Sequence, residues 1–203
     1  MIDPRADGRL AHLPSHLKLA LLDRDGTILD ETGYLVDPKR VVLLPGAARA
    51  VARLNAAGVP VAVVTNQSAI ARGMLDEAGL ERIHSRLADE LAHEEAHVDL
   101  WLFAPYHPDH CEPDPKEAER RKPGAGMLRE ALEHFGVAAG DAVTIGDSDR
   151  DLVAGERAGV ASLLVLTGKG ASELERAQAR LGHDPACARD LAEAVELALA
   201  AGR

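Results

Sequence analysis

Short apolar runs alternate with amphipathic stretches along most of this chain. Runs with the apolar, β-branched character of strands occupy positions 18–23, 59–65, 98–103, 142–147 and 161–166. Segments with helical spacing of apolar residues occupy 46–57, 77–96, 124–136, 150–158, 172–181 and 187–200. Strands that alternate with helices predict an α/β fold, a Rossmann-like three-layer sandwich with a central parallel sheet.

The same pattern indicates the domain organisation. Val61 to Val64 form a continuous apolar run, which is typical of a strand buried on both faces. Residues 1–16, in contrast, carry scattered charges and prolines without periodicity. We therefore predict a flexible N-terminal arm over residues 1–17 and a single domain over residues 18–203.

Composition narrows the range of partners. A hydrophobic fraction of 46% is enough for a sizeable core, and the net charge of −10 opposes binding to nucleic acid or to an anionic membrane. No apolar run reaches transmembrane length, and no signal-peptide pattern is present. Two cysteines, Cys111 and Cys187, are too few for a disulfide framework. We expect a cytoplasmic protein without nucleic-acid or membrane partners.

The first predicted strand ends in two aspartates, Asp23 and Asp25, followed by Gly26. At strand spacing the two carboxylates project to the same side, and Arg24 turns away. Close like charges repel, and a divalent cation would neutralise them while Gly26 lets the backbone turn over it. The alternative is an ordinary acidic turn after a strand.

Polar residues also follow the other predicted strands. Residues 65–68 (Thr-Asn-Gln-Ser) follow the second strand, Lys122 precedes the helix at 124–136, and Asp147 ends a later strand. Each of these has an ordinary explanation as a helix cap or a solvated charge. Together they predict a site at the carboxyl edge of the sheet, where the long connections 28–44 and 104–122 also begin.

These motifs resemble those of the haloacid dehalogenase superfamily of phosphohydrolases. The four superfamily motifs correspond to Asp23–Thr27, Thr65, Lys122 and Gly146–Asp151. Within the superfamily, the chain resembles the D-glycero-D-manno-heptose 1,7-bisphosphate phosphatases and the related histidinol-phosphatases. This narrower resemblance rests on Asp23–Thr27, Gly33-Tyr34, Thr65–Gly73 and Arg121–Pro123.

The resemblance implies a role for each motif residue. Asp23 would be the nucleophile that forms an aspartyl-phosphate, and Asp25 would protonate the leaving group and then activate water. Mg²⁺ would be held by the carboxylates of Asp23 and Asp147 and by the Asp25 backbone carbonyl. Thr65 and Lys122 would bind the phosphoryl oxygens.

Further residues are implied for substrate binding and for support of the site. Asp151 would orient Lys122 or a metal-bound water rather than bind metal. Arg72 is a further candidate cation, with a surface role as the alternative, and Ser148 stands where the family often has lysine. The candidate substrate-binding residues are Glu31, Gly33, Tyr34, Asn66, Gln67, Ser68 and Arg121.

The second long connection departs from the family pattern, which usually includes a structural zinc. The four ligand positions are occupied here by Ala104, Tyr106, Ala118 and Arg120, which do not replace thiolates. We therefore expect no zinc and a loop held by packing of Trp101, Phe103 and Tyr106. An alternative metal site would be formed by His107, His110 and Cys111.

The sequence thus predicts a Mg²⁺-dependent phosphatase of a small phosphorylated metabolite, foremost the 7-phosphate of a heptose 1,7-bisphosphate. A histidinol-phosphate phosphatase is the alternative within the class, and a non-catalytic phosphate- or partner-binding protein is the alternative outside it. The segments between motifs are too short for a large cap domain. The family resemblance favours a monomer.

Overall fold

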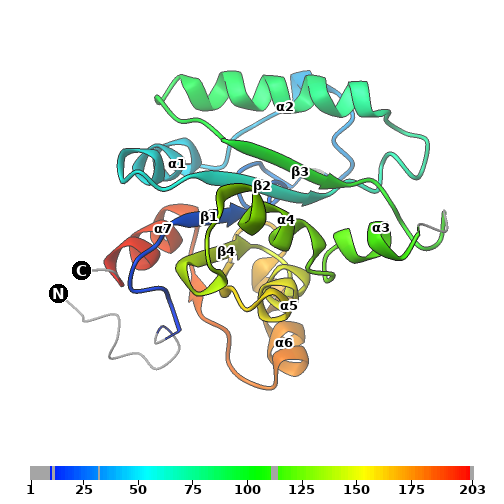
Figure 1. Cartoon of the computed structure of the whole chain (residues 1–203). Coiled ribbons are helices and arrows are strands. Elements are labelled where there is room, and N and C mark those ends of the chain that lie inside the picture. Colours follow the sequence, from blue (N-terminus) through cyan, green and yellow to red (C-terminus); the bar gives the residue numbers. More distant parts are fainter. Residues whose placement is uncertain (1–9, 11, 32, 111–113, 202–203) are drawn as a thin grey trace.

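A single parallel sheet of six strands forms the centre of the computed structural model, which describes residues 10, 12–31, 33–110 and 114–201 (Figure 1). The order across the sheet is β3-β2-β1-β4-β5-β6. The strands are β1 (Leu19–Leu22), β2 (Val61–Asn66), β3 (Leu100–Ala104), β4 (Ala142–Gly146), β5 (Ala161–Val165) and β6 (Cys187–Ala188).

Helices cover both faces of this sheet (Figure 1). The helices are α1 (Ala47–Ala56), α2 (Glu77–Ala92), α3 (Pro115–Arg120), α4 (Gly126–Phe135), α5 (Asp149–Ala158), α6 (Gly170–Leu181) and α7 (Leu191–Ala200), with short 3₁₀ helices η3 (Pro38–Arg40) and η4 (Ala139–Asp141). In β1, Ala20 and Leu22 join the core under α1, α2 and α7, whereas Leu19 and Leu21 join the core under α4 and α5. The predicted three-layer α/β sandwich is therefore confirmed.

Two elements differ from the sequence prediction. Residues 187–188 form an edge strand, so the helix predicted over 187–200 begins only at Leu191. The predicted loop 104–122 contains α3, which a capping box stabilises between Asp114 and Glu117. Both elements are short, and neither carries the long periodic pattern on which the prediction depended.

The N-terminal segment contacts the domain within the part that the structure describes. Leu10 and Leu13, inside the predicted arm, are buried in the larger core. None of the described helices combines the length and the apolar character needed to cross a bilayer.

The sheet order determines where the site lies. β1 pairs with β2 on one side and β4 on the other, all in parallel. The segments that follow these three central strands therefore meet at one edge of the sheet.

Candidate active site

A cavity of about 350 Å³ opens at this edge of the sheet. Every residue that the sequence predicts for the site lines it. They are Asp23, Asp25, Glu31, Gly33, Tyr34, Thr65, Asn66, Gln67, Ser68, Arg121, Lys122 and Asp147.

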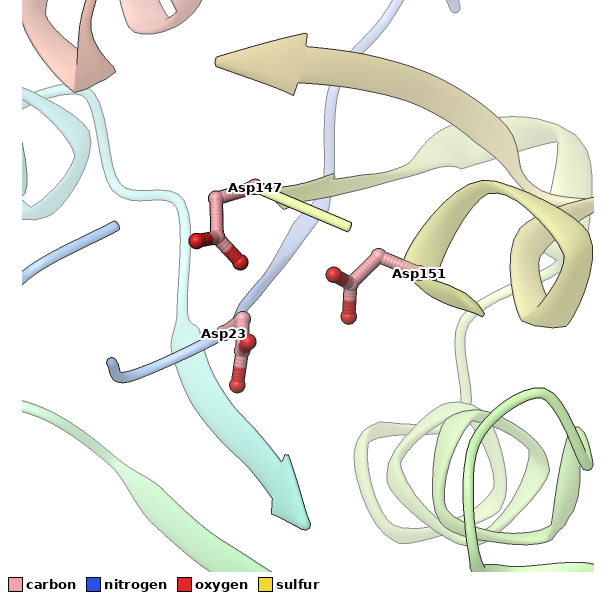
Figure 2. Close-up of side chains that lie close together, drawn as sticks. All are labelled: Asp23, Asp147 and Asp151. Atoms are coloured by element: carbon pink, nitrogen blue, oxygen red, sulfur yellow. The ribbon is translucent and has the colours of Figure 1, made fainter. Parts of the chain in front are cut away.

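Three buried aspartates lie close together (Figure 2), and all three line the cavity. Asp23 follows β1, Asp147 follows β4, and Asp151 lies in the first turn of α5. Their carboxylate oxygens lie within 4.8 Å of one another, and no other group of three or more potential metal ligands comes together in the described part of the chain.

Burial and mutual repulsion oppose the charged forms of two of these groups. Burial, together with the carboxylates of Asp151 and Asp25, raises the pKa of Asp23 to about 6 despite the opposing charge of Lys122. Burial and the carboxylate of Asp23 raise the pKa of Asp147 to about 7. A bound cation would remove this repulsion, so the donor set fits Mg²⁺.

Asp151 has a different surrounding from the other two aspartates. Its Oδ1 accepts a hydrogen bond from Lys122 Nζ at 2.5 Å, and its Oδ2 accepts one from the Ser148 backbone N–H at 3.1 Å. Asp151 therefore orients Lys122 and caps α5, which leaves Asp23 and Asp147 as the carboxylates best placed to hold a cation.

Lys122 is a fully buried cation between carboxylates. Its Nζ also donates to the Val64 backbone carbonyl at 2.7 Å and lies 3.0 Å from Asp23 Oδ1. Burial favours the neutral amine, but the carboxylates of Asp151 and Asp23 outweigh it and raise the pKa of Lys122. The ammonium charge is therefore fixed beside the predicted nucleophile.

Asp23 itself has one oxygen engaged and one open. Oδ1 accepts from the Arg24 backbone N–H at 2.8 Å and faces Lys122. Among the residues that the structure describes, no hydrogen-bond donor reaches Oδ2. This carboxylate thus keeps an oxygen for attack on phosphorus or for a cation.

Two glycines make room for the Asp147 carboxylate. A Cβ atom at Gly26 would lie 2.1 Å from Asp147 Oδ2, and one at Gly168 would lie 2.2 Å from the same oxygen. Both residues have positive φ, where glycine is favoured. The backbone N–H of Lys169 donates to this oxygen at 2.8 Å, so the carboxylate is held between the segments after β1 and β5.

The polar segment after β2 forms hydrogen bonds with residues that the sequence predicts to be catalytic. Gln67 Nε2 donates to Asp25 Oδ2 at 2.9 Å and to Thr65 Oγ1 at 2.8 Å. Since Thr65 accepts this bond, its hydroxyl hydrogen remains to be donated to a phosphoryl oxygen. The Asn66 amide exchanges two hydrogen bonds with the backbone of Lys122. These amides, predicted as substrate contacts, line the cavity but are used within the protein.

The prediction that Arg24 turns away from the aspartate pair is wrong. β1 ends at Leu22, so strand geometry no longer governs the residues beyond it. The Arg24 side chain is only 1% exposed, and its guanidinium binds the Asp25 carboxylate at 2.9 Å.

The rim of the cavity carries several charges. Glu31 Oε2 pairs with Lys169 Nζ at 2.9 Å, and Glu31 Oε1 accepts from the Gly33 backbone N–H at 3.1 Å. The Arg72 guanidinium lies 5.4 Å from the centre of the Tyr34 ring. These contacts connect the loop after β1 to the segments after β2 and β5.

Four polar residues line the cavity that the sequence analysis did not assign to it: Arg24, His107, Arg150 and Lys169. Lys169 lies four residues beyond the end of β5 at Val165. The rule that identified the other groups, which looks for polar residues after the carboxyl end of each strand (the strand-end rule), would have found it. Arg150 lies inside the fourth motif. Burial and the charges of Arg121 and Arg72 lower the pKa of His107. The cavity lining is therefore positively charged around His107, through Arg121 and Arg72.

Of the four positions where the family usually has zinc ligands, the two that carry polar side chains here, Tyr106 and Arg120, bind other parts of the protein. Tyr106 Oη donates to Glu117 Oε1 at 2.7 Å, and Arg120 donates to the Phe103 carbonyl at 3.2 Å and pairs with Glu130.

The aromatic residues do not form the single cluster that the sequence predicts. Trp101 and Phe103 contact the His84 ring on α2 instead of Tyr106. In the predicted alternative metal site, His107 and His110 have ring centres 5.4 Å apart, and Cys111 lies outside the described residues.

Known proteins show the same fold and share much of the sequence. A family model described as HAD-hydrolase-like matches residues 119–194. D-glycero-beta-D-manno-heptose-1,7-bisphosphate 7-phosphatase of Pseudomonas aeruginosa is 41% identical over 157 residues, which cover 77% of this chain and 85% of the relative. The enzyme of that name from Mesorhizobium japonicum is 38% identical over 82% of this chain and 76% of its own.

A solved structure extends this similarity to three dimensions. D,D-heptose 1,7-bisphosphate phosphatase of Bordetella bronchiseptica, in complex with magnesium and phosphate, superimposes with a TM-score of 0.79 at 36% identity. The alignment covers 90% of this chain and 98% of that one. The chain therefore belongs to the haloacid dehalogenase-like phosphatases, in the family of the heptose-1,7-bisphosphate 7-phosphatases.

Proposed function

We propose that the protein is a Mg²⁺-dependent phosphomonoester hydrolase that removes the 7-phosphate of D-glycero-D-manno-heptose 1,7-bisphosphate. The observation that carries the proposal is the convergence of Asp23, Asp147 and Lys122 at the base of one cavity. A nucleophile, a cation site and a fixed positive charge are what attack on a phosphate dianion requires.

The first chemical step uses Asp23 and Asp25. A carboxylate oxygen of Asp23 attacks phosphorus in line with the sugar oxygen, and the bond from phosphorus to that oxygen breaks. Protonated Asp25 gives its proton to the departing alkoxide. Lys122 and the Thr65 hydroxyl stabilise the charge on the phosphoryl oxygens. The products of this step are the heptose 1-phosphate and an aspartyl-phosphate at Asp23.

The second step returns the enzyme to its starting state. Asp25, now a carboxylate, takes a proton from water as the water attacks the aspartyl-phosphate, and inorganic phosphate leaves. Asp23 and Asp147 would hold Mg²⁺, which would supply the charge neutralisation that lets an anionic nucleophile approach an anionic substrate.

The phosphate that remains on the substrate would be bound by the positively charged side chains that line the cavity. Arg121 presents a planar guanidinium there, and Arg72 and Lys169 lie on the same cavity lining. The sugar between the two phosphates would lie against the loop that carries Glu31 and Tyr34. We therefore propose Arg121 as the residue that selects a bisphosphate.

A substrate panel tests this proposal. With Mg²⁺, the enzyme should release phosphate from heptose 1,7-bisphosphate far faster than from histidinol phosphate or fructose 1,6-bisphosphate, and both heptose anomers should be compared. Asp23→Asn should abolish turnover, whereas Asp30→Asn, at an exposed carboxylate outside the cavity, should not. Equal rates for the wild type and Asp23→Asn would contradict the proposal.

A further inference from the structure

The proposed acid–base group Asp25 is held by a partly buried hydrogen-bond network that includes a residue outside the catalytic motifs. Arg24 Nη2 donates to both oxygens of Asp25 at 2.9 Å, and Arg24 Nε donates to Oδ1 at 3.2 Å. Two parallel contacts of this kind fix the plane of a carboxylate as well as its position.

The other end of the guanidinium contacts His84 on α2. Arg24 Nη1 lies 3.3 Å from His84 Nε2, and the contact is buried. Arg24 is the donor, so His84 Nε2 is the acceptor and its ring is neutral. Burial and the charge of Arg24 lower the pKa of His84 to about 3, in keeping with this assignment.

The His84 ring is itself fixed by aromatic packing. It stacks on Trp101 with the ring centres 4.6 Å apart and an interplanar angle of 24°, and Phe103 meets it edge-on at 6.5 Å. A continuous series of contacts therefore links the aromatic side chains of the edge strand β3 to His84 on α2, then to Arg24 after β1, and finally to Asp25.

We propose that His84 is a positioning residue for catalysis: by accepting from Arg24 it keeps the guanidinium aligned on Asp25, and so sets the orientation from which Asp25 protonates the leaving group. The inference rests on the proposed phosphatase function. Without this acceptor, a buried N–H of Arg24 would be left unsatisfied, and a turn of the guanidinium toward another partner would disturb its alignment on Asp25.

A purely structural role of His84 predicts a different outcome from a positioning role. A loss of packing would slow all substrates alike. Misalignment of Asp25 would slow only those substrates whose leaving group must receive a proton as it departs. Nitrophenolate leaves without a proton, whereas phenolate and sugar alkoxides depend on one increasingly as their basicity rises.

The experiment compares kcat/KM for p-nitrophenyl phosphate, phenyl phosphate and heptose 1,7-bisphosphate in two variants. His84→Phe keeps a ring against Trp101 and removes the acceptor, while His84→Gln keeps an acceptor at the same reach. We expect His84→Phe to lose about tenfold on the heptose substrate, less on phenyl phosphate and under about threefold on p-nitrophenyl phosphate. His84→Gln should restore most of this loss.

Control variants distinguish a positioning role of His84 from a general effect of replacing a histidine. His134→Phe makes the same replacement at an exposed histidine on α4, and it should leave all three rates unchanged. Equal losses on all substrates, or equal losses in the two His84 variants, would overturn the proposal. If His84→Phe does not fold, Arg24→Lys, which keeps the charge without the fork, should show the same selective loss. Because the two aryl phosphates alone report the leaving-group dependence, failure to hydrolyse the heptose would contradict only the proposed substrate.

Discussion

The carboxyl groups of Asp23 and Asp147 are under two opposing requirements. The proposed catalysis needs both groups in their charged form, whereas burial favours the neutral form. The pKa values of about 6 and about 7 lie well above the ordinary value for aspartate of 3.8. The folded protein without a cation therefore binds protons more tightly than the unfolded chain does. The contribution of these two groups to the free energy of unfolding should therefore fall as the pH rises from about 4 through about 7.

The same groups make magnesium binding pH-dependent. Lowering the pH from about 8 to about 6 should weaken Mg²⁺ binding roughly tenfold, because Asp147 must lose its proton before it can bind a cation. Isothermal titration calorimetry at the two pH values measures this difference. Added Mg²⁺ should also raise the melting temperature more at the higher pH. An affinity that does not change with pH would contradict the raised pKa.

Gly26 offers a second test at the scale of one residue. Gly26→Ala places a methyl group 2.1 Å from Asp147 Oδ2, so the carboxylate must move. We expect Mg²⁺ affinity and kcat to fall at least tenfold, together with a loss of about 1–3 kcal/mol in the free energy of unfolding. Gly58→Ala is the matched control, because Gly58 also has positive φ but no atom within 4 Å of the new methyl group. It should destabilise the fold without changing Mg²⁺ affinity.

At the scale of secondary-structure elements, the strand-end rule located the site because parallel strands deliver their carboxyl ends to one edge. This is why residues as distant in sequence as Asp23 and Asp147 line one cavity. The rule cannot say which polar group a side chain binds. Gln67 and Asn66 line the cavity, as the rule predicts, but it gives no sign that their amides also bind Asp25, Thr65 and Lys122.

Short elements escaped the sequence analysis for a related reason. α3 has six residues and buries none, so it has no apolar stripe to detect. Its signal was local: Asp114 and Glu117 form a capping box around Pro115. β6 has two residues, and pairing with β5, rather than its own composition, makes it a strand.

The connection that contains α3 should be stable without metal. Tyr106→Phe should lower the free energy of unfolding by about 1 kcal/mol, because it removes the hydrogen bond to Glu117. Denaturant titration measures this value, and Tyr34→Phe, at a 44% exposed side chain, should have little effect. Elemental analysis should find no stoichiometric zinc, and a zinc chelator should not unfold the protein. One equivalent of bound zinc would contradict this account.

At the scale of the whole molecule, burial of the sheet on both faces stabilises the site indirectly. Leu19, Ala20, Leu21 and Leu22 are all fully buried, so the strand that leads into Asp23 is held from both sides. Alternation of strands and helices in the sequence was enough to predict this sandwich. The order of the strands was not predictable in the same way, because it depends on which distant segments pair.

The N-terminal segment adds to the same core, although its sequence gives no periodic signal. Leu13→Ala should cost about 2 kcal/mol of unfolding free energy, because the leucine is 8% exposed and packs in the larger core. Val42→Ala, at a 57% exposed position, should change it by less than about 0.5 kcal/mol. Thermal denaturation compares the two variants. Light scattering should show that the wild type and both variants are monomers.

Lys169 divides its two functions between backbone and side chain. Its N–H holds the Asp147 carboxylate, while its ammonium group reaches Glu31 at the rim. Every residue except proline has that N–H, so the side chain at this position can be varied without removing the bond to Asp147. Substitutions at position 169 can therefore change the charge at the rim of the cavity and leave the hydrogen bond to Asp147 in place. This makes position 169 a natural starting point for engineering substrate preference, and a position at which that preference can diverge in evolution.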